Sequence, residues 1–290
     1  MAGRADADPI LMIAGPTASG KTALAIEEAL RVGGEVISAD SRQVYRGLDI
    51  GTAKPALEER GGVPHHFIDE LDPDEPFSAG AFARAAEDRI ADVLARGRVP
   101  IVAGGSTLYL RALRDGLASI PATDPAVRAR LNADLERGGL PALLARLRGV
   151  DPETAARVDA RNPARIVRAL EVHESTGVPL SHFHAHPPAP PRFAYRVMLL
   201  DPPRDVLYAR IDARVEVMME AGLMEEVRGL LETGVSPDLA PLRTIGYAEV
   251  IAHLGGAYGL GETVSLIQRN TRRYAKRQRT YFQKFVVDLQ

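Results

Sequence analysis

Short apolar runs alternate with amphipathic stretches in the first part of the chain. The runs at residues 10–14, 35–40 and 99–105 have the length of buried strands. The longer stretches at 23–34 and 79–97 place apolar residues three and four positions apart, which is the period of a helix with one buried face. This alternation predicts an α/β fold with a parallel sheet made of right-handed βαβ units.

The polar segments after the second strand are predicted to be loops. Residues 41–55 and 64–82 contain Gly or Pro among many polar side chains. Asp40 stands at the end of the second strand. Because the carboxyl ends of parallel strands meet at one edge of a sheet, we expect Asp40 to face the same crevice as the loop after the first strand.

The middle of the chain has no apolar strand pattern, only helical patterns separated by Pro and Gly. These helical patterns cover residues 124–139, 140–150, 151–160 and 162–177. We therefore predict an all-helical lobe at 116–193, inserted into a core made of residues 1–115 and 194–290. The lobe is predicted to end in a Pro-rich extended linker that begins at Ser181.

The core pattern resumes after the lobe. An apolar run at 195–201 predicts a fourth strand, and residues 204–234 predict two helices broken at Gly222. Four apolar residues form a stripe at helical spacing, which indicates core packing: Leu207, Ile211, Val215 and Met218. A last helix is predicted over residues 262–285.

A phosphate-binding motif lies between the first strand and the first helix. It consists of Gly15, Pro16, Thr17, Ala18, Ser19, Gly20, Lys21 and Thr22. Strand, glycine loop, Lys-Thr pair and helix in this order are typical of a phosphate-binding loop, or P-loop. Backbone N–H groups and the helix N-terminus would face the anion, Lys21 would add a charge, and the Thr22 hydroxyl could ligate Mg²⁺.

Composition narrows the class of protein. The sequence has 290 residues, 46% of them hydrophobic and 26% charged, and contains no Cys. Disulfides, thiolate zinc sites and cysteine nucleophiles are therefore excluded. The first residues are polar, and no run has the length of a membrane span, so we expect a cytoplasmic protein without a membrane association.

The charge is unevenly distributed. From Glu262 to the end, seven basic residues stand against two acidic ones, a net +5 in a chain whose total is −2. Arg269, Arg272, Lys276 and Arg279 share one side of the predicted last helix, with few acids near them in sequence. A basic ridge of this kind indicates a polyanion, with nucleic acid favoured.

The motif alone leaves the reaction open. Phosphoryl transfer on a P-loop usually needs a strand that ends in a metal-binding Asp, but the strand at 99–105 ends in glycines. Asp201 ends another strand, yet two prolines follow it, which makes it a weak metal ligand candidate. The paired His65 and His66 lack a third ligand at suitable spacing, and the alternating histidines at 182–186 are assigned no role.

Several longer motifs resemble the tRNA dimethylallyltransferases. They read, in order, GPTASGKT, ISADSRQVYRGLDIGTAKP, PHHFID, VAGGSTLYLRAL, DGLASIPATDPAVRARL, NPARIVRALEV and QRNTRRYAKRQRTYF, and they span nearly the whole chain. The resemblance implies a P-loop NTPase-like core with an inserted helical lobe. It also implies transfer of a dimethylallyl group from dimethylallyl diphosphate to N6 of adenosine at tRNA position 37, by a monomer.

The resemblance also implies roles for individual residues. The diphosphate would lie on the loop at 15–22, with Mg²⁺ held through Thr22, while Thr17 and Arg214 stabilise the leaving group and Asp40 accepts the N6 proton. Eight residues would contact tRNA: Asp40, Ser41, Arg42, Gln43, Ser106, Arg128, Arg165 and Arg168. Ser106 stands where the family usually has Thr, and Tyr281-Phe282 stand where a Trp is common.

Three alternatives remain. A prenyltransferase acting on free adenine nucleotides would use the same loop and base, but would not need the lobe or the basic helix. A small-molecule kinase would place ATP on the glycine loop. An RNA-binding, GTPase-like switch would need a guanine-reading NKxD motif, which the sequence lacks.

Overall fold

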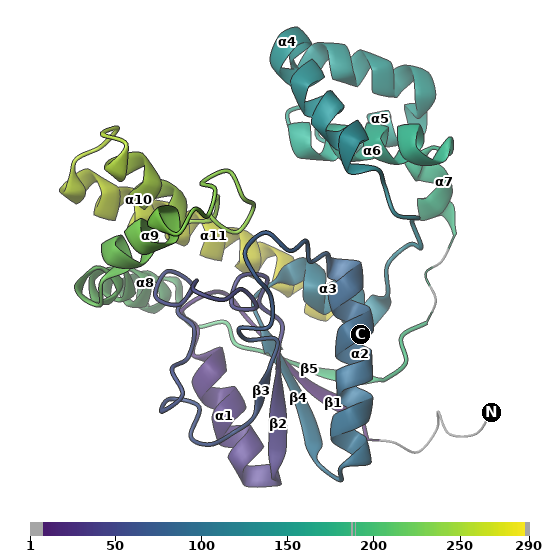
Figure 1. The fold of residues 1–290 in the computed structure, drawn as a ribbon. Coiled ribbons are helices and arrows are strands. Elements are labelled where there is room, and N and C mark those ends of the chain that lie inside the picture. Colours follow the sequence, from purple (N-terminus) through teal and green to yellow (C-terminus); the bar gives the residue numbers. More distant parts are fainter. Residues whose placement is uncertain (1–7, 187, 189, 288–290) are drawn as a thin grey trace. The chain divides into compact units, whose positions relative to one another are not determined.

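The computed structural model describes residues 8–186, 188 and 190–287, and its core is one parallel sheet in the order β3-β2-β4-β1-β5 (Figure 1). The strands are β1 (Ile10–Ala14), β2 (Gly34–Ser38), β3 (His65–His66), β4 (Val99–Gly104) and β5 (Tyr195–Leu199). Neighbouring strands pair in parallel at all four positions of this sheet. The α/β class with a P-loop NTPase-like parallel sheet is therefore confirmed.

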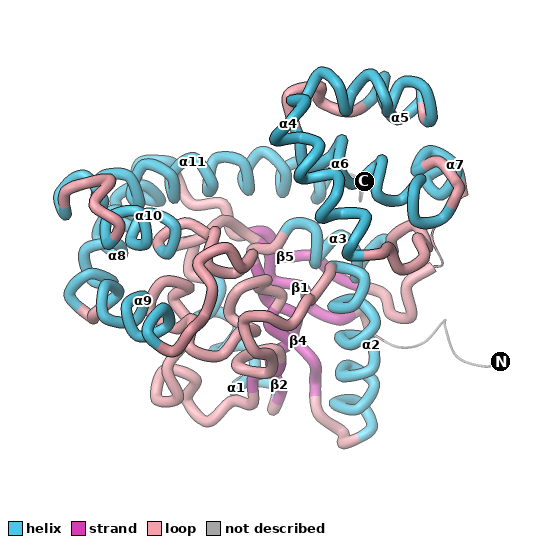
Figure 2. Tube along the Cα trace, turned by 45° about the horizontal axis from the view of Figure 1, so that its top comes forward, coloured by secondary structure: helices cyan, strands magenta, loops and turns pink. Residues whose placement is uncertain are grey.

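Two helices cover the sheet, α1 (Lys21–Val32) and α2 (Ala79–Ala95). Figures 1 and 2 show them on opposite sides of the sheet. Ala25 and Ala29 of α1 pack on sheet residues that include Ile13 and Ile101, while α2 contributes fully buried side chains such as Phe82. β1 and β4, in the middle of the sheet, are apolar because both of their faces are covered, whereas β5 carries the exposed Arg196.

The remaining helices of this part are α3 (Thr107–Asp115), α8 (Arg204–Glu220), α9 (Leu223–Glu232), α10 (Tyr247–Leu254) and α11 (Leu260–Val287). The break at Gly222 is confirmed, since this residue adopts a left-handed conformation between α8 and α9. In the predicted stripe, Leu207, Ile211 and Val215 are buried, whereas Met218 is half-buried. α10 was not anticipated from the sequence.

The chain divides into two compact units, one made of residues 1–114 and 191–290 and the other of 115–190. The second unit contains α4 (Pro125–Val150), α5 (Pro152–Arg157), α6 (Pro163–Thr176) and α7 (Leu180–Ala185). α4 bends at Gly139, which has a non-helical backbone where the sequence pattern changed from one helix to the next. Buried Leu131, Leu147 and Leu170 are part of the core that joins α4 to α6.

Two local predictions were wrong. The extended linker expected from Ser181 begins instead with α7, because the proline run starts only after this helix and Leu180 is buried against the unit's core. Residues 187 and 189 of that linker lie outside the described residues. The loop expected at 64–82 includes β3, a two-residue edge strand that pairs with β2 and is too short to leave an apolar pattern.

No helix in the described part of the chain is long and apolar enough to cross a membrane.

Candidate phosphate and acceptor site

The P-loop connects β1 to the first turn of α1. Gly20 caps the helix in a left-handed conformation, with φ of 96°, and a Cβ on Gly15 would lie 2.6 Å from the carbonyl oxygen of Leu200. The N–H of Ser19 donates to the carbonyl of Pro16 at 3.3 Å. The chain therefore turns tightly around the helix N-terminus, which is the usual form of an anion cradle.

Lys21 lies at the centre of the charges around this loop. Its Nζ donates to the carbonyl oxygen of Pro16 at 2.7 Å. The pKa of Lys21 is lowered to about 8, mainly by burial, which the charge of Asp40 opposes and the charge of Arg214 reinforces. The predicted residues Asp40 and Arg214 are thus close enough to Lys21 for their charges to act on it.

Ser19 supplies a second polar group to the cradle. Its Oγ is buried, and among the described residues it has no hydrogen-bond partner. A buried hydroxyl without a partner is costly in a folded protein unless a ligand or water satisfies it. An anionic group at the loop would provide an acceptor for this hydroxyl.

Asp40 lies immediately beyond β2, at the same edge of the sheet as the P-loop. Its Oδ1 accepts hydrogen bonds from the N–H groups of Arg42 at 2.8 Å and Gln43 at 3.3 Å. The neighbouring carbonyl of Ala39 accepts from the N–H of Ser106 at 3.2 Å. The structure therefore brings Asp40 and Ser106 to adjacent strand ends.

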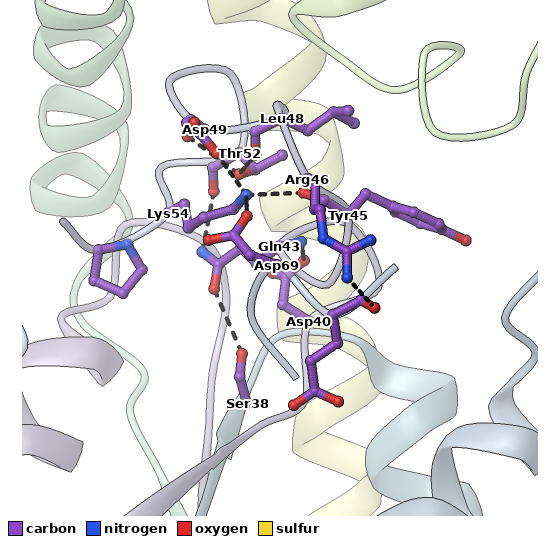
Figure 3. Close-up of polar contacts among 12 residues, drawn as sticks. Ser38, Asp40, Gln43, Tyr45, Arg46, Leu48, Asp49, Thr52, Lys54 and Asp69 are labelled. Atoms are coloured by element: carbon purple, nitrogen blue, oxygen red, sulfur yellow. Dashed lines mark hydrogen bonds and ion pairs between the residues drawn. The ribbon is translucent and has the colours of Figure 1, made fainter. Parts of the chain in front are cut away.

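The loop at residues 41–54 is held by internal side-chain contacts (Figure 3). The Gln43 amide donates to the carbonyls of Thr52 at 3.2 Å and Ala53 at 3.1 Å. Lys54 has a side chain that is only 4% exposed, and its Nζ binds the Tyr45 carbonyl at 2.8 Å and two carboxylates, those of Asp49 and Asp69. Gln43, predicted to contact tRNA, therefore uses its amide to shape this loop.

A carboxylate from α9 holds the tip of the same loop. Glu226 accepts hydrogen bonds from the N–H groups of Asp49 at 3.1 Å, Ile50 at 2.7 Å and Gly51 at 3.2 Å, and from the hydroxyl of Tyr247 at 2.5 Å. A Cβ on Gly51 would lie 2.4 Å from the Tyr247 ring, so only Gly fits there. Sequence reasoning missed Glu226, since nothing near it in the sequence indicates this contact.

The last helix, α11, passes beside the site. Although 37% of Tyr274 is exposed, partial loss of water around its hydroxyl and the negative charge of Asp40 raise its pKa to about 12. Arg277 stacks over the Tyr274 ring, with its guanidinium carbon 5.8 Å from the ring centroid. These interactions place this turn of α11 near Asp40.

The basic ridge on α11 differs from the sequence prediction. Arg272 is paired with Asp212, and Arg279 is paired with Asp201, so two of the four ridge residues have acidic partners. Those acids were overlooked because they lie on α8 and just after β5, far away in the sequence. A surface hollow on α11 is lined by Lys276 of the ridge together with Arg273, Arg277, Thr280, Tyr281 and Lys284.

Within the second unit, two predicted arginines share one buried carboxylate. Glu171, with a side chain that is 4% exposed, binds Arg128 at 2.8 Å and Arg168 at 3.1 Å, and accepts from the Thr123 hydroxyl at 2.8 Å. Burial alone would raise the pKa of Glu171, but these hydrogen bonds bring it below its ordinary value. Arg165 is exposed on α6.

Compared with the ligand sets of metal sites, the described side chains do not form a conventional one. Among the described residues, no group of three or more His, Cys, Asp or Glu side chains is placed to hold an ion. Thr22 lies exposed in the first turn of α1, next to the cradle. Its hydroxyl is the group that would ligate Mg²⁺ together with phosphate oxygens.

Comparisons of the sequence and the structure with known proteins point to one family. The family model described as IPP transferase matches residues 43–285. The tRNA dimethylallyltransferase of Salinibacter ruber is 52% identical over 96% of this chain and 86% of its own length. The structure of a Bacillus halodurans tRNA isopentenylpyrophosphate transferase is 41% identical, with a TM-score of 0.67, and the match covers 96% of this chain and 87% of that one.

A third match is the structure of a eukaryotic dimethylallyltransferase acting on tRNA. It is 29% identical, with a TM-score of 0.79, and the match covers 94% of this chain and 69% of that one. The family model and the relative in Salinibacter ruber agree with the motifs found along the sequence. The chain belongs to the IPP transferase family.

Proposed function

We propose that this protein transfers a dimethylallyl group from dimethylallyl diphosphate to N6 of the adenosine at tRNA position 37. The observation that carries the proposal is that Asp40 and the P-loop follow β2 and β1 at one edge of the parallel sheet, where the charge of Asp40 acts on Lys21. A phosphate group and an acceptor amine could then meet at the edge of the sheet where these strands end. The names of the relatives described above support tRNA as the acceptor.

The diphosphate of the donor binds on the P-loop. Lys21 and Arg214 contribute positive charge, and the Thr17 hydroxyl contributes a hydrogen-bond donor, to the oxygens that become more negative as the allylic C–O bond breaks. Fixed donors aimed at developing charge are usually the largest contribution to catalysis. Mg²⁺, held through the Thr22 hydroxyl, would neutralise further charge on the diphosphate.

The acceptor is the exocyclic amine of adenosine, which is a poor nucleophile. N6 forms a bond to the allyl carbon, the bond from that carbon to the diphosphate oxygen breaks, and the N6 proton passes to the carboxylate of Asp40. The N–H groups of Arg42 and Gln43 orient this carboxylate through Oδ1. A fixed general base of this kind contributes on the order of 10²–10⁴-fold in rate.

The tRNA binds through its backbone and its unpaired anticodon loop. The basic side chains that line the hollow on α11 suit phosphate groups, which provide affinity without reading sequence. Ser41, Arg42 and Ser106 lie at the strand ends where the flipped adenosine enters. In the second unit, Arg165 is exposed, and Arg128 and Arg168 are oriented by Glu171.

The test incubates purified protein and Mg²⁺ with labelled dimethylallyl diphosphate and either unmodified tRNA or AMP. We expect label in tRNA and none in AMP. Label in AMP alone would make the protein a prenyltransferase of free nucleotides. No label in either substrate, with consumption of ATP, would assign the P-loop to a kinase.

A further inference from the structure

One amide on α11 connects the P-loop to the end of β4. The side chain of Gln278 is buried, with 3% of the residue exposed. Its Oε1 accepts a hydrogen bond from the N–H of Thr17 at 2.9 Å, and its Nε2 donates to the carbonyl of Gly105 at 2.8 Å. The two partners lie 173 and 261 positions away along the chain, so only the complete fold brings them together.

The chemistry of the two partners requires an amide. Thr17 presents a donor and Gly105 presents an acceptor, so the side chain between them must accept on one atom and donate on the other. A carboxylate cannot donate to the carbonyl, and a thioether provides neither strong bond. Gly105 is also required, because a Cβ there would lie 2.8 Å from Nε2 of Gln278.

This link lies at the centre of the phosphate cradle. The same Cβ position on Gly105 is 3.7 Å from Nζ of Lys21, so the amide, the lysine and the loop are neighbours. A second contact fastens the loop to the same helix, since Ala18 packs with Ala275 of α11 and with Leu207 of α8. α11 thus holds two consecutive residues of the loop, one by packing and one by a hydrogen bond.

We propose that Gln278 is a positioning residue that keeps the P-loop in the form that binds diphosphate. It touches neither proposed substrate and acts through the backbone of Thr17. The proposal takes its ligand, diphosphate, from the proposed function. Loss of the amide should therefore weaken donor binding and leave tRNA affinity unchanged, because the basic residues that line the hollow on α11 are exposed whereas this amide is buried.

The experiment compares Gln278→Met and Gln278→Glu with Gln283→Met, an exposed glutamine of the same helix. Binding of inorganic diphosphate with Mg²⁺ is measured by calorimetry, and KM is measured separately for dimethylallyl diphosphate and for tRNA. We expect both Gln278 variants to weaken diphosphate binding and raise the donor KM by about tenfold, since each leaves a buried polar group unsatisfied. The tRNA KM and the Gln283→Met control should stay at the wild-type values.

A second perturbation covers the case in which the Gln278 variants do not fold, as judged by thermal unfolding. Gly105→Ala displaces the Gln278 amide without changing its chemistry. This variant should therefore also raise the Kd for diphosphate. The proposal would be overturned if folded Gln278→Met bound diphosphate as tightly as the wild-type protein. If only Gly105→Ala folds, wild-type affinity in that variant would overturn it. If diphosphate binding depends on Gln278 but the wild-type protein does not prenylate tRNA, only the proposed function is overturned.

Discussion

Two loops at the same edge of the sheet are held by different means. The P-loop, residues 15–22, takes its tight turn from its own glycines and the first turn of α1, and Gln278 of α11 then holds it through a single hydrogen bond. The loop at 41–54 has no helix or strand of its own and depends on buried Lys54 within it and on Glu226, which lies about 175 positions further along the chain. The turn of the first loop can therefore be recognised from a short motif, whereas no local motif indicates how the second loop is held.

This difference determines how each loop should respond to substitution. A change in the P-loop should act mainly on the affinity for diphosphate, because its residues form the proposed phosphate site. A change in the contacts that hold the second loop should act on stability and on the placement of Asp40 together. The following predictions test that contrast, starting with the largest expected effect.

Removing the proposed base should have the largest effect. Asp40→Asn keeps an oxygen that can accept from the N–H groups of Arg42 and Gln43, so the loop retains its shape. Transfer to tRNA in a single turnover should fall about 10²- to 10⁴-fold, with unchanged tRNA binding. Asp72→Asn, which alters an exposed carboxylate in a neighbouring loop, serves as the control. A wild-type rate in Asp40→Asn would rule out Asp40 as the base.

Removing the lysine charge should weaken donor binding. Lys21→Met should raise the Kd for diphosphate by about 10- to 100-fold, because a charge-assisted hydrogen bond is lost. The stability of the protein should change little, since Nζ contacts only the Pro16 carbonyl within the loop. Equal affinity of the variant and the wild-type protein in calorimetry would contradict the P-loop assignment.

The same lysine predicts a pH dependence. Burial lowers the pKa of Lys21 to about 8, so the side chain is charged below that pH and becomes neutral above it. Bound diphosphate favours the charged form, and affinity should therefore fall as pH rises above 8, by up to about tenfold per pH unit. Lys21→Arg stays charged and should show only the titration of diphosphate itself. An identical pH profile in both proteins would refute this role of Lys21.

Releasing the tip of the second loop should affect stability and rate together. Glu226→Gln replaces a carboxylate that accepts from three backbone N–H groups by an amide that can accept on only one oxygen. The free energy of unfolding should fall by about 1–3 kcal/mol, and the transfer rate should fall as Asp40 becomes less well placed. Denaturant unfolding with Glu225→Gln, an exposed neighbour, provides the comparison. A loss of stability without any change in rate would separate this loop from catalysis.

Removing the buried lysine of the second loop should have the smallest effect. Lys54→Met leaves the Tyr45 carbonyl without this donor, but the Asp49 and Asp69 side chains are 58% and 43% exposed and can be solvated. We expect a loss of about 1 kcal/mol in the free energy of unfolding. Arg46, in the same loop as Lys54, forms an exposed ion pair with Asp72 of a neighbouring loop. Arg46→Met should therefore reduce the free energy of unfolding by less than Lys54→Met does. A larger loss in Arg46→Met would contradict the importance assigned to burial.

Sequence patterns predicted the parts of this protein that are locally encoded. The apolar runs predicted β1, β2, β4 and β5, and the P-loop motif predicted the phosphate cradle. β3 was missed because it is held by pairing with β2 and by the contact between His66 and Glu35, at 2.7 Å.

The contacts that support the site could not be predicted from local sequence patterns. Nothing near Gln278 in the sequence indicates its role, because its partners, Thr17 and Gly105, come from distant segments. The same holds for Glu226, whose sequence neighbours are ordinary residues of an amphipathic helix. Arg272 and Arg279 looked unpaired because their acidic partners lie on other elements.

The most direct test of the proposed reaction locates the transferred group within the tRNA. After reaction with dimethylallyl diphosphate, tRNA would be digested to nucleosides and oligonucleotides and analysed by mass spectrometry, alongside a transcript with guanosine at position 37. The account predicts N6-dimethylallyladenosine at position 37 and no modified nucleoside in the guanosine transcript. A dimethylallyl group on another nucleotide, or on the guanosine transcript, would contradict it.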